Sequence, residues 1–189
     1  MGEEVGERFP EFLGFLLDNP IRRILEKPEK RVRDLGLVGG KLLEVGCGPG
    51  FFSISLAENN RVVVSFDLSP GFLRRARHKA EENKIGNVAF LRCEASKIPI
   101  KDEIFDRAFV HFVYHEVNDR ENFIAELARV LKRDGAVVVV EVEPARGLGK
   151  LFGPPGASSD TANTKFKAHF DRVDVHREGR RRYTLRAWK

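Results

Sequence analysis

From residue 41 to residue 142, short apolar runs alternate with segments whose apolar residues recur every three or four positions. Short runs predict strands, and a period of three to four predicts helices. The predicted strands are 41–45, 61–66, 87–92, 104–110 and 136–142. The predicted helices are 51–58, a segment that begins at Ser69-Pro70 and ends near Asn83, and a segment from Asn118 or Asp119 to Lys132 that Asp134-Gly135 terminates. This alternation predicts an α/β fold with a doubly wound, mostly parallel sheet.

The first 35 residues carry two further helical patterns. One apolar stripe consists of Phe9, Phe12, Leu13, Leu16 and Leu17. Asn19-Pro20 is typical of a helix start, with asparagine as the cap and proline at the first helical position. We expect Pro28 to divide the segment that follows into two helices, because proline cannot donate a backbone hydrogen bond.

The C-terminal part of the chain has a different pattern. A loop rich in Gly and Pro, a short helix and the two strands of an antiparallel hairpin are expected at 147–156, from Ser159-Asp160 to about His169, at 170–176 and at 182–188. We therefore expect a single domain over residues 1–189, made of N-terminal helices (1–35), a core (36–143) and this C-terminal part (144–189).

A glycine-rich turn follows the first predicted strand of the core. Gly46, Gly48 and Gly50 are spaced as G-x-G-x-G, and Glu44 stands two residues before them. Such a turn lets a cofactor lie against bare backbone at the carboxyl end of a parallel strand. A dinucleotide fingerprint would need a third glycine at position 51, which is Phe51. The spacing therefore disfavours a nicotinamide or flavin dinucleotide.

Asp67 ends the second predicted strand, about twenty residues after the glycine turn. A carboxylate at this position can accept hydrogen bonds from both hydroxyls of a ribose. The alternative is that Asp67 caps the helix that begins after Ser69. The strand before it and its distance from the turn favour ribose binding.

The segment from Glu44 to Gly50 resembles the first motif of class I S-adenosylmethionine-dependent methyltransferases, especially the small-molecule branch that includes ubiquinone and menaquinone biosynthesis enzymes. The resemblance covers about residues 36–143. It implies S-adenosylmethionine as the cofactor and a Rossmann-like, seven-stranded sheet with a C-terminal antiparallel hairpin and N-terminal helices over the site.

The resemblance also implies roles for individual residues. Those expected to bind the cofactor are Glu44, Gly46, Gly48, Gly50, Asp67, Leu68, Glu94, Ala95 and His111. Glu44 would lie near the methionine amino group, Glu94-Ala95 would contact the adenine, and His111 would line the methionine portion. His115 corresponds to a histidine that often faces the substrate, where an imidazole could accept a proton from a hydroxyl or amine. Packing or helix capping is the alternative for His115.

Charge is unevenly distributed along the chain. The net charge is +5, but nine Lys or Arg against three Asp or Glu give residues 165–189 a charge of +6. Residues 22–33 hold six basic and two acidic side chains. Basic patches can bind nucleic acid, although solvated faces of helices and hairpins are the more common explanation.

Composition and the absence of certain sequence patterns indicate the cellular location, the absence of a metal site and the growth temperature that we expect. No apolar run approaches the ~20 residues of a membrane helix, and the N-terminus lacks a signal-peptide pattern, so we expect a cytoplasmic protein without membrane insertion. Cys47 and Cys93 are the two cysteines, and no group of residues has metal-ligand spacing, so no metal site is expected. The sequence contains no Gln and 32% charged residues, which suggests a thermophilic source as a hypothesis.

The resemblance implies methyl transfer from S-adenosylmethionine to a small-molecule acceptor by direct in-line displacement. Two alternatives remain open. One is an RNA or protein methyltransferase that uses the basic C-terminal region; against it, Pro154-Pro155 lacks the flanking residues of the Asn/Asp-Pro-Pro-Tyr motif. The other is a module that binds the cofactor without catalysis. The acceptor and the oligomeric state are left open.

Overall fold

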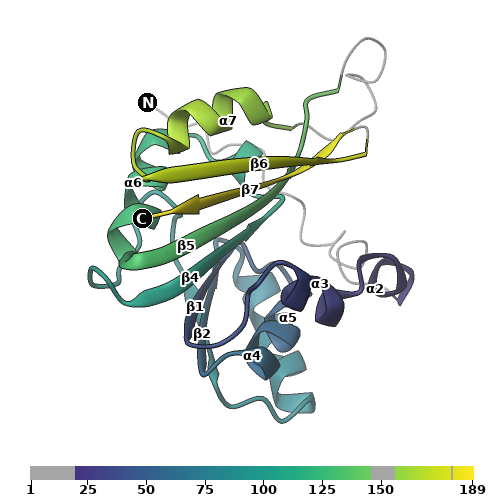
Figure 1. The fold of residues 1–189 in the computed structure, drawn as a ribbon. Coiled ribbons are helices and arrows are strands. Elements are labelled where there is room, and N and C mark those ends of the chain that lie inside the picture. The colour runs from purple at the N-terminus through teal and green to yellow at the C-terminus, as the bar shows by residue number, and fades with distance from the viewer. Residues whose placement is uncertain (1–19, 146–155, 180) are drawn as a thin grey trace, which may run out of the picture. The chain divides into compact units, whose positions relative to one another are not determined.

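A computed structural model describes residues 20–145, 156–179 and 181–189 (Figure 1). The chain divides after Glu94 into two compact units. Seven strands, in the order β3-β2-β1-β4-β5-β7-β6, belong to one mixed sheet. The predicted fold class, a mostly parallel sheet that ends in an antiparallel hairpin, is confirmed.

The first unit begins, within the described residues, with two short helices. These are α2 (Pro20–Glu26) and α3 (Pro28–Asp34). Lys27 separates them in the left-handed conformation, with φ of 45°. The division predicted at Pro28 is therefore confirmed. The apolar stripe from Phe9 to Leu17 and the predicted cap Asn19 lie outside the described residues.

Three parallel strands and two helices form the rest of the first unit. The strands are β1 (Lys41–Val45), β2 (Val62–Asp67) and β3 (Val88–Arg92), and the helices are α4 (Ser53–Asn59) and α5 (Pro70–Glu82). Helix α4 contacts β2, and α5 packs against β2 and β3. The Ser69 side chain accepts a hydrogen bond from the backbone N–H of Phe72 at 3.0 Å, which confirms it as the cap of α5. Because the strands are parallel, the segments that follow β1, β2 and β3 begin at the same edge of this unit.

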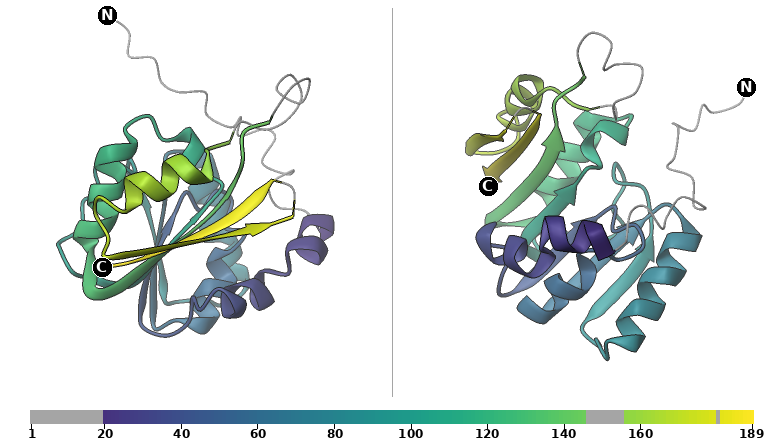
Figure 2. Two further views of the ribbon diagram at one scale, coloured as in Figure 1. Left: turned by 45° about the horizontal axis from the view of Figure 1, so that its top comes forward. Right: turned by 90° about the vertical axis from the view of Figure 1, so that its right-hand side faces the viewer.

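The second unit contains the other four strands. Strands β4 (Phe105–His111) and β5 (Leu131–Val142) are parallel, and β6 (Arg172–Glu178) and β7 (Arg182–Trp188) form the hairpin. Strand β7 pairs antiparallel with β5. The helices are the 3₁₀ turn η2 (Tyr114–Glu116), α6 (Arg120–Val130) and α7 (Ser159–Phe166). Helix α7 packs on β6 and β7, as both views in Figure 2 show.

The structure corrects the predicted boundary between α6 and β5. Helix α6 ends at Val130 rather than Lys132, because Leu131 is already extended and pairs with Phe105 of β4. The register between β4 and β5 is irregular before Ala136. At Gly135 a Cβ atom would lie 2.8 Å from the carbonyl oxygen of Lys132. The glycine thus permits a tight bend inside the strand and does not end the helix.

Smaller corrections concern other ends of elements. Helix α4 begins at Ser53 rather than Phe51, and the cap of α7 is Ser158 rather than Ser159. Helix α7 ends at Phe166, before the predicted His169, and β6 begins at Arg172 rather than residue 170. The turn η2 was not predicted. Residues 147–155 of the predicted loop lie outside the described residues.

Candidate cofactor and active site

The glycine turn after β1 has a backbone that only glycine adopts readily. Gly46, Gly48 and Gly50 have φ of 65°, 52° and 79°. At Gly50 a Cβ atom would lie 3.0 Å from the Cβ of Ala76, so α5 can approach only a bare backbone. At Gly48 a Cβ atom would meet nothing within 4 Å. The turn is therefore packed against α5 at Gly50 and open at Gly48.

Two further contacts hold this turn in place within the first unit. The Lys79 ammonium of α5 donates to the carbonyl oxygen of Pro49 at 3.0 Å. The guanidinium of Arg22 in α2 lies 4.2 Å from the centre of the Phe51 ring. Both contacts fix the turn from outside, and the second joins an N-terminal helix to it.

Asp67 lies at the end of β2 and is tied to the glycine turn. Its Oδ2 accepts a hydrogen bond from the Gly48 N–H at 2.8 Å, and its Oδ1 accepts one from the Ser69 N–H at 2.9 Å. The cap of α5 is Ser69, so Asp67 supports the residue that caps the helix and is not itself the cap. The sequence did not reveal the bond to Gly48.

Glu44 is buried in β1 rather than exposed at the turn. Its Oε2 accepts hydrogen bonds from the hydroxyls of Ser53 and Ser65, both at 2.6 Å. Burial raises the pKa of Glu44 to about 7, although the two serine hydrogen bonds oppose the rise. The carboxyl thus joins β1, β2 and the start of α4 around the turn, and its ionisation falls near neutral pH.

The other predicted residues of the first unit also follow strand ends. Leu68 comes directly after β2, and its carbonyl oxygen accepts a hydrogen bond from the Nε of Arg92 at 3.1 Å. Glu94 is exposed two residues after β3. Together with Asp67 and the glycine turn, these residues lie at the edge of the unit where the carboxyl ends of parallel strands bind ligands.

In the second unit, two predicted residues flank strand β4. Ala95 opens the segment that leads to β4, and His111 is the last residue of that strand. The ring of His111 lies 4.1 Å from the ring of Phe112, which adopts a left-handed φ of 57°. A non-glycine residue in this conformation at a strand end is typical of functional sites, where the surrounding structure enforces it.

His115 is held by a carboxylate that the sequence analysis missed. Glu141 of β5 is fully buried, and its Oε2 lies 2.9 Å from Nδ1 of His115 and accepts from the His115 backbone N–H at 3.2 Å. The other ring nitrogen, Nε2, lies 3.8 Å from the carboxylate of Glu116. Burial lowers the pKa of His115, but the Glu141 hydrogen bond and the charges of Glu141 and Glu116 outweigh it and raise the pKa overall.

Two tyrosines pack near this pair. Tyr183 lies opposite Glu141 in the β5–β7 register, and Tyr114 begins η2. Both phenol oxygens are buried without a hydrogen-bond partner among the described residues. Burial, followed by the charge of Glu141, raises the pKa of the Tyr183 phenol. Tyr183 therefore stays protonated as a potential donor beside Glu141. The sequence analysis did not identify Tyr183.

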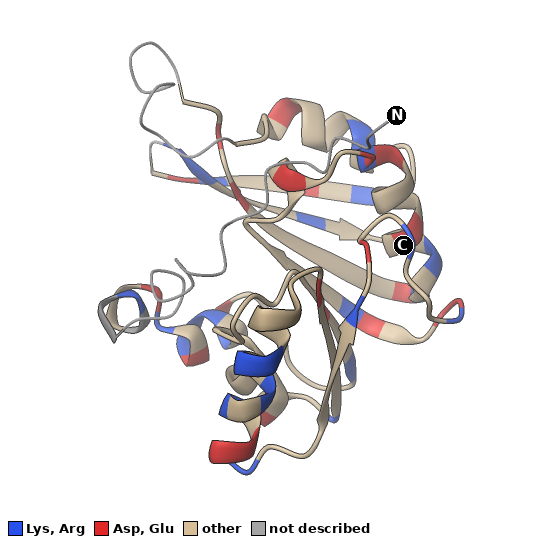
Figure 3. Cartoon of the chain, turned by 180° about the vertical axis from the view of Figure 1, so that it is seen from behind, with Lys and Arg blue, Asp and Glu red and all other residues tan. Residues whose placement is uncertain are grey.

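Some basic residues in and next to the C-terminal hairpin form ion pairs with acidic residues. Figure 3 shows both blue and red segments on β6, whereas β7 carries Arg182 and Arg186 and no acidic residue. Arg172 pairs with Asp174, Arg177 with Asp160 at 2.8 Å, and Lys189 with Glu103 at 3.6 Å. In the part of the chain that the structure describes, no helix is long and apolar enough to cross a membrane, and no cluster of three or more His, Cys, Asp or Glu could hold a metal ion.

Comparison with known proteins shows the family to which the chain belongs. Residues 43–139, more than half of the chain, match the family model described as a methyltransferase domain. The chain is similar to a phosphatidylethanolamine N-methyltransferase of Cereibacter sphaeroides, with 33% identity over 151 residues that cover 79% of this chain and 73% of that protein. It is also similar to a ubiquinone/menaquinone biosynthesis C-methyltransferase of Citrifermentans bemidjiense, with 31% identity over 115 residues that cover 58% and 49%, respectively. The chain thus spans about half the length of this second relative.

Among solved structures, the fold is similar to that of a SAM-dependent methyltransferase from Aquifex aeolicus. The TM-score is 0.81 at 26% sequence identity, and the alignment covers 95% of this chain and 98% of that one. The fold and the glycine turn define the class of S-adenosylmethionine-dependent methyltransferases, and S-adenosylmethionine is the cofactor. The chain belongs to the methyltransferase-domain family.

Proposed function

We propose that the protein methylates a small-molecule acceptor and that the edge formed by the ends of β1 and β2 holds the cofactor. The observation that carries this proposal is the carboxylate of Asp67 at the end of β2, which accepts a hydrogen bond from the Gly48 N–H of the glycine turn at 2.8 Å. A carboxylate fixed beside bare glycine backbone fits an adenosine with two ribose hydroxyls. The bound cofactor would supply an electrophilic methyl group on a sulfonium.

The proposed cofactor-binding residues are those expected from the sequence. They are Glu44, Gly46, Gly48, Gly50, Asp67, Leu68, Glu94, Ala95 and His111. Glu44 would act from behind the glycine turn and would not touch the cofactor directly. Its buried carboxyl is held there by hydrogen bonds from the hydroxyls of Ser53 and Ser65. A negative charge there would favour a cationic amino group at the turn.

His115 is proposed to accept the proton that the acceptor loses. Its Nδ1 faces the buried carboxylate of Glu141, so a proton on Nδ1 would be held there. Nε2 would then remain available to accept the proton that the substrate loses. The His115 side chain is 9% exposed. The protein would then need only to orient the methyl acceptor, exclude water and take up one proton. This is expected where the cofactor supplies the reactive group.

The relatives guide the choice of acceptor. One is named as a methyltransferase of phosphatidylethanolamine and another of ubiquinone or menaquinone biosynthesis. The test is methyl transfer from radiolabelled S-adenosylmethionine to phosphatidylethanolamine, to demethylmenaquinone and to bulk RNA. Label in a lipid-soluble product supports the proposal, and label only in RNA would replace the small-molecule acceptor with a nucleic acid.

A cytoplasmic location and a thermophilic source are proposed on composition alone. Two cysteines suit a reducing compartment, and a sequence with 32% charged residues and no Gln suits high temperature. The melting temperature of the purified protein tests the second point.

A further inference from the structure

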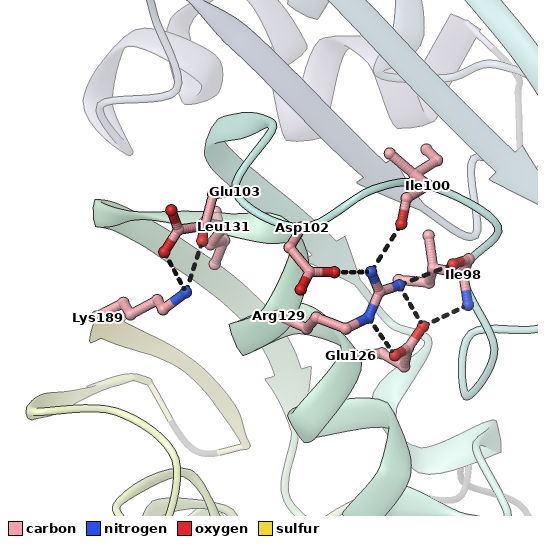
Figure 4. A network of polar contacts seen from close by, with 8 residues as sticks. All are labelled: Ile98, Ile100, Asp102, Glu103, Glu126, Arg129, Leu131 and Lys189. Atoms are coloured by element: carbon pink, nitrogen blue, oxygen red, sulfur yellow. Dashed lines mark hydrogen bonds and ion pairs between the residues drawn. The ribbon is translucent and has the colours of Figure 1, made fainter.

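Two side chains of α6 hold the segment that leads from β3 to β4. Figure 4 shows Arg129 and Glu126 facing this segment, which has no helix or strand between Ala95 and Ile104. The Arg129 guanidinium donates to the carbonyl oxygens of Ile98 and Ile100 at 2.9 and 2.7 Å. It also donates to the carboxylate of Asp102 at 2.6 Å. One arginine thus contacts three residues of the segment.

Glu126 completes the arrangement. Its Oε2 accepts from the backbone N–H of Ile98 at 2.7 Å, and its two oxygens accept from Arg129 at 2.6 and 2.8 Å. The hydrogen bond from Arg129 lowers the pKa of Glu126, so the carboxylate stays ionised. Both polar groups of the Ile98 backbone are therefore bound by a charged side chain. We call Arg129 and Glu126 the α6 clamp.

The α6 clamp differs from the ordinary ion pairs of this unit. The side chains of Arg129 and Glu126 are 31% and 20% exposed, whereas the side chain of Arg133 is 89% exposed and lies 3.8 Å from the carboxylate of Glu103. Charged hydrogen bonds to backbone groups in a partly shielded site are stronger and more directional than exposed ion pairs. A lysine could not reproduce the planar fork that reaches several acceptors at once. The clamp is suited to fix a backbone path.

We propose that the α6 clamp positions the segment that reads the adenine ring of the cofactor. This inference rests on the proposed function, in which Ala95, three residues before Ile98, contacts that ring. A backbone that recognises a purine edge must be held close to its bound position before the ligand arrives, because ordering a loop on binding weakens affinity. Arg129 and Glu126 are positioning residues, since they act through the segment and not on the cofactor itself.

The test measures cofactor affinity by calorimetry, so it needs no methyl acceptor. The probes are S-adenosylhomocysteine and S-inosylhomocysteine, in which an oxygen replaces the adenine amino group. We expect Arg129→Ala to weaken S-adenosylhomocysteine binding at least tenfold and to reduce the preference for the adenine compound. Arg129→Lys should behave like Arg129→Ala, and the matched control Arg133→Ala should bind as the wild type does.

Circular dichroism and urea unfolding must show that each variant is folded at the titration temperature. If Arg129→Ala does not fold, Glu126→Gln and Asp102→Asn remove single parts of the contact network, and the same loss of adenine preference is expected for Glu126→Gln. Unchanged affinity in a folded clamp variant overturns the inference, and so does an equal loss for both probes. A wild-type protein that binds neither probe contradicts the proposed function instead.

Discussion

Glu44 should make the protein less stable as the pH rises, and Glu44→Gln should remove that effect. Burial raises the pKa of Glu44 from 4.5 to about 7 in the folded protein. The unfolded chain therefore loses this proton at a lower pH than the folded protein does. The contribution of Glu44 to stability is fully present below about pH 4.5 and is lost as the pH rises through about 7. The difference in pKa corresponds to about 3 kcal/mol.

The assay is urea unfolding of the wild type and of Glu44→Gln at several pH values between about 4.5 and 8. Glutamine is uncharged and keeps one oxygen that can accept from Ser53 and Ser65. We expect the free energy of unfolding of the variant to gain about 3 kcal/mol relative to the wild type across this range. The control Glu58→Gln replaces an exposed glutamate of α4 and should follow the wild type. Parallel pH profiles for the wild type and Glu44→Gln would refute the reasoning.

Three further predictions concern stability and titration. Gly50→Ala should destabilise the protein by about 2 kcal/mol or more, because the new Cβ would combine a left-handed φ of 79° with a contact of 3.0 Å to the Cβ of Ala76. The control Gly39→Ala has a φ of 76° and no neighbour within 4 Å, so in the same urea assay it measures the cost of the backbone conformation alone. Glu141→Gln should lower the pKa of His115, measured from its imidazole NMR signals, and an unchanged pKa would show that Glu141 does not control it. If the source is thermophilic, the melting temperature should exceed the ~45–65 °C of mesophilic domains, and a value inside that range would reject the hypothesis.

The strand and helix pattern of the core could be predicted because it depends on local periodicity. Strand β1 was predicted at 41–45 and observed at Lys41–Val45, and the end of β2 at Asp67 was also expected. The prediction failed at the end of α6, where Leu131 leaves the helix to pair with Phe105. That pairing joins residues far apart in sequence, and a local pattern carries no information about it.

The candidate site was visible in the sequence only in part. Asp67 and the glycines stand at strand ends, where residue type and spacing indicate chemistry. Glu141 was missed because it lies within an apolar strand and its partner His115 comes from another segment. Arg129 was missed because two of its acceptors are backbone carbonyl oxygens, which leave no trace in residue identities, and the carboxylate of Asp102 lies in another segment.

The central claim is that S-adenosylmethionine binds where Asp67 meets the glycine turn. The most direct measurement is a calorimetric titration of S-adenosylhomocysteine into the wild type and Asp67→Ala. We expect saturable binding with one ligand per chain in the wild type, and an affinity lower by about 1–3 kcal/mol in the variant, because charged hydrogen bonds to the ribose are lost. Wild-type protein that shows no binding at millimolar ligand, or a folded Asp67→Ala variant with unchanged affinity, would contradict the account.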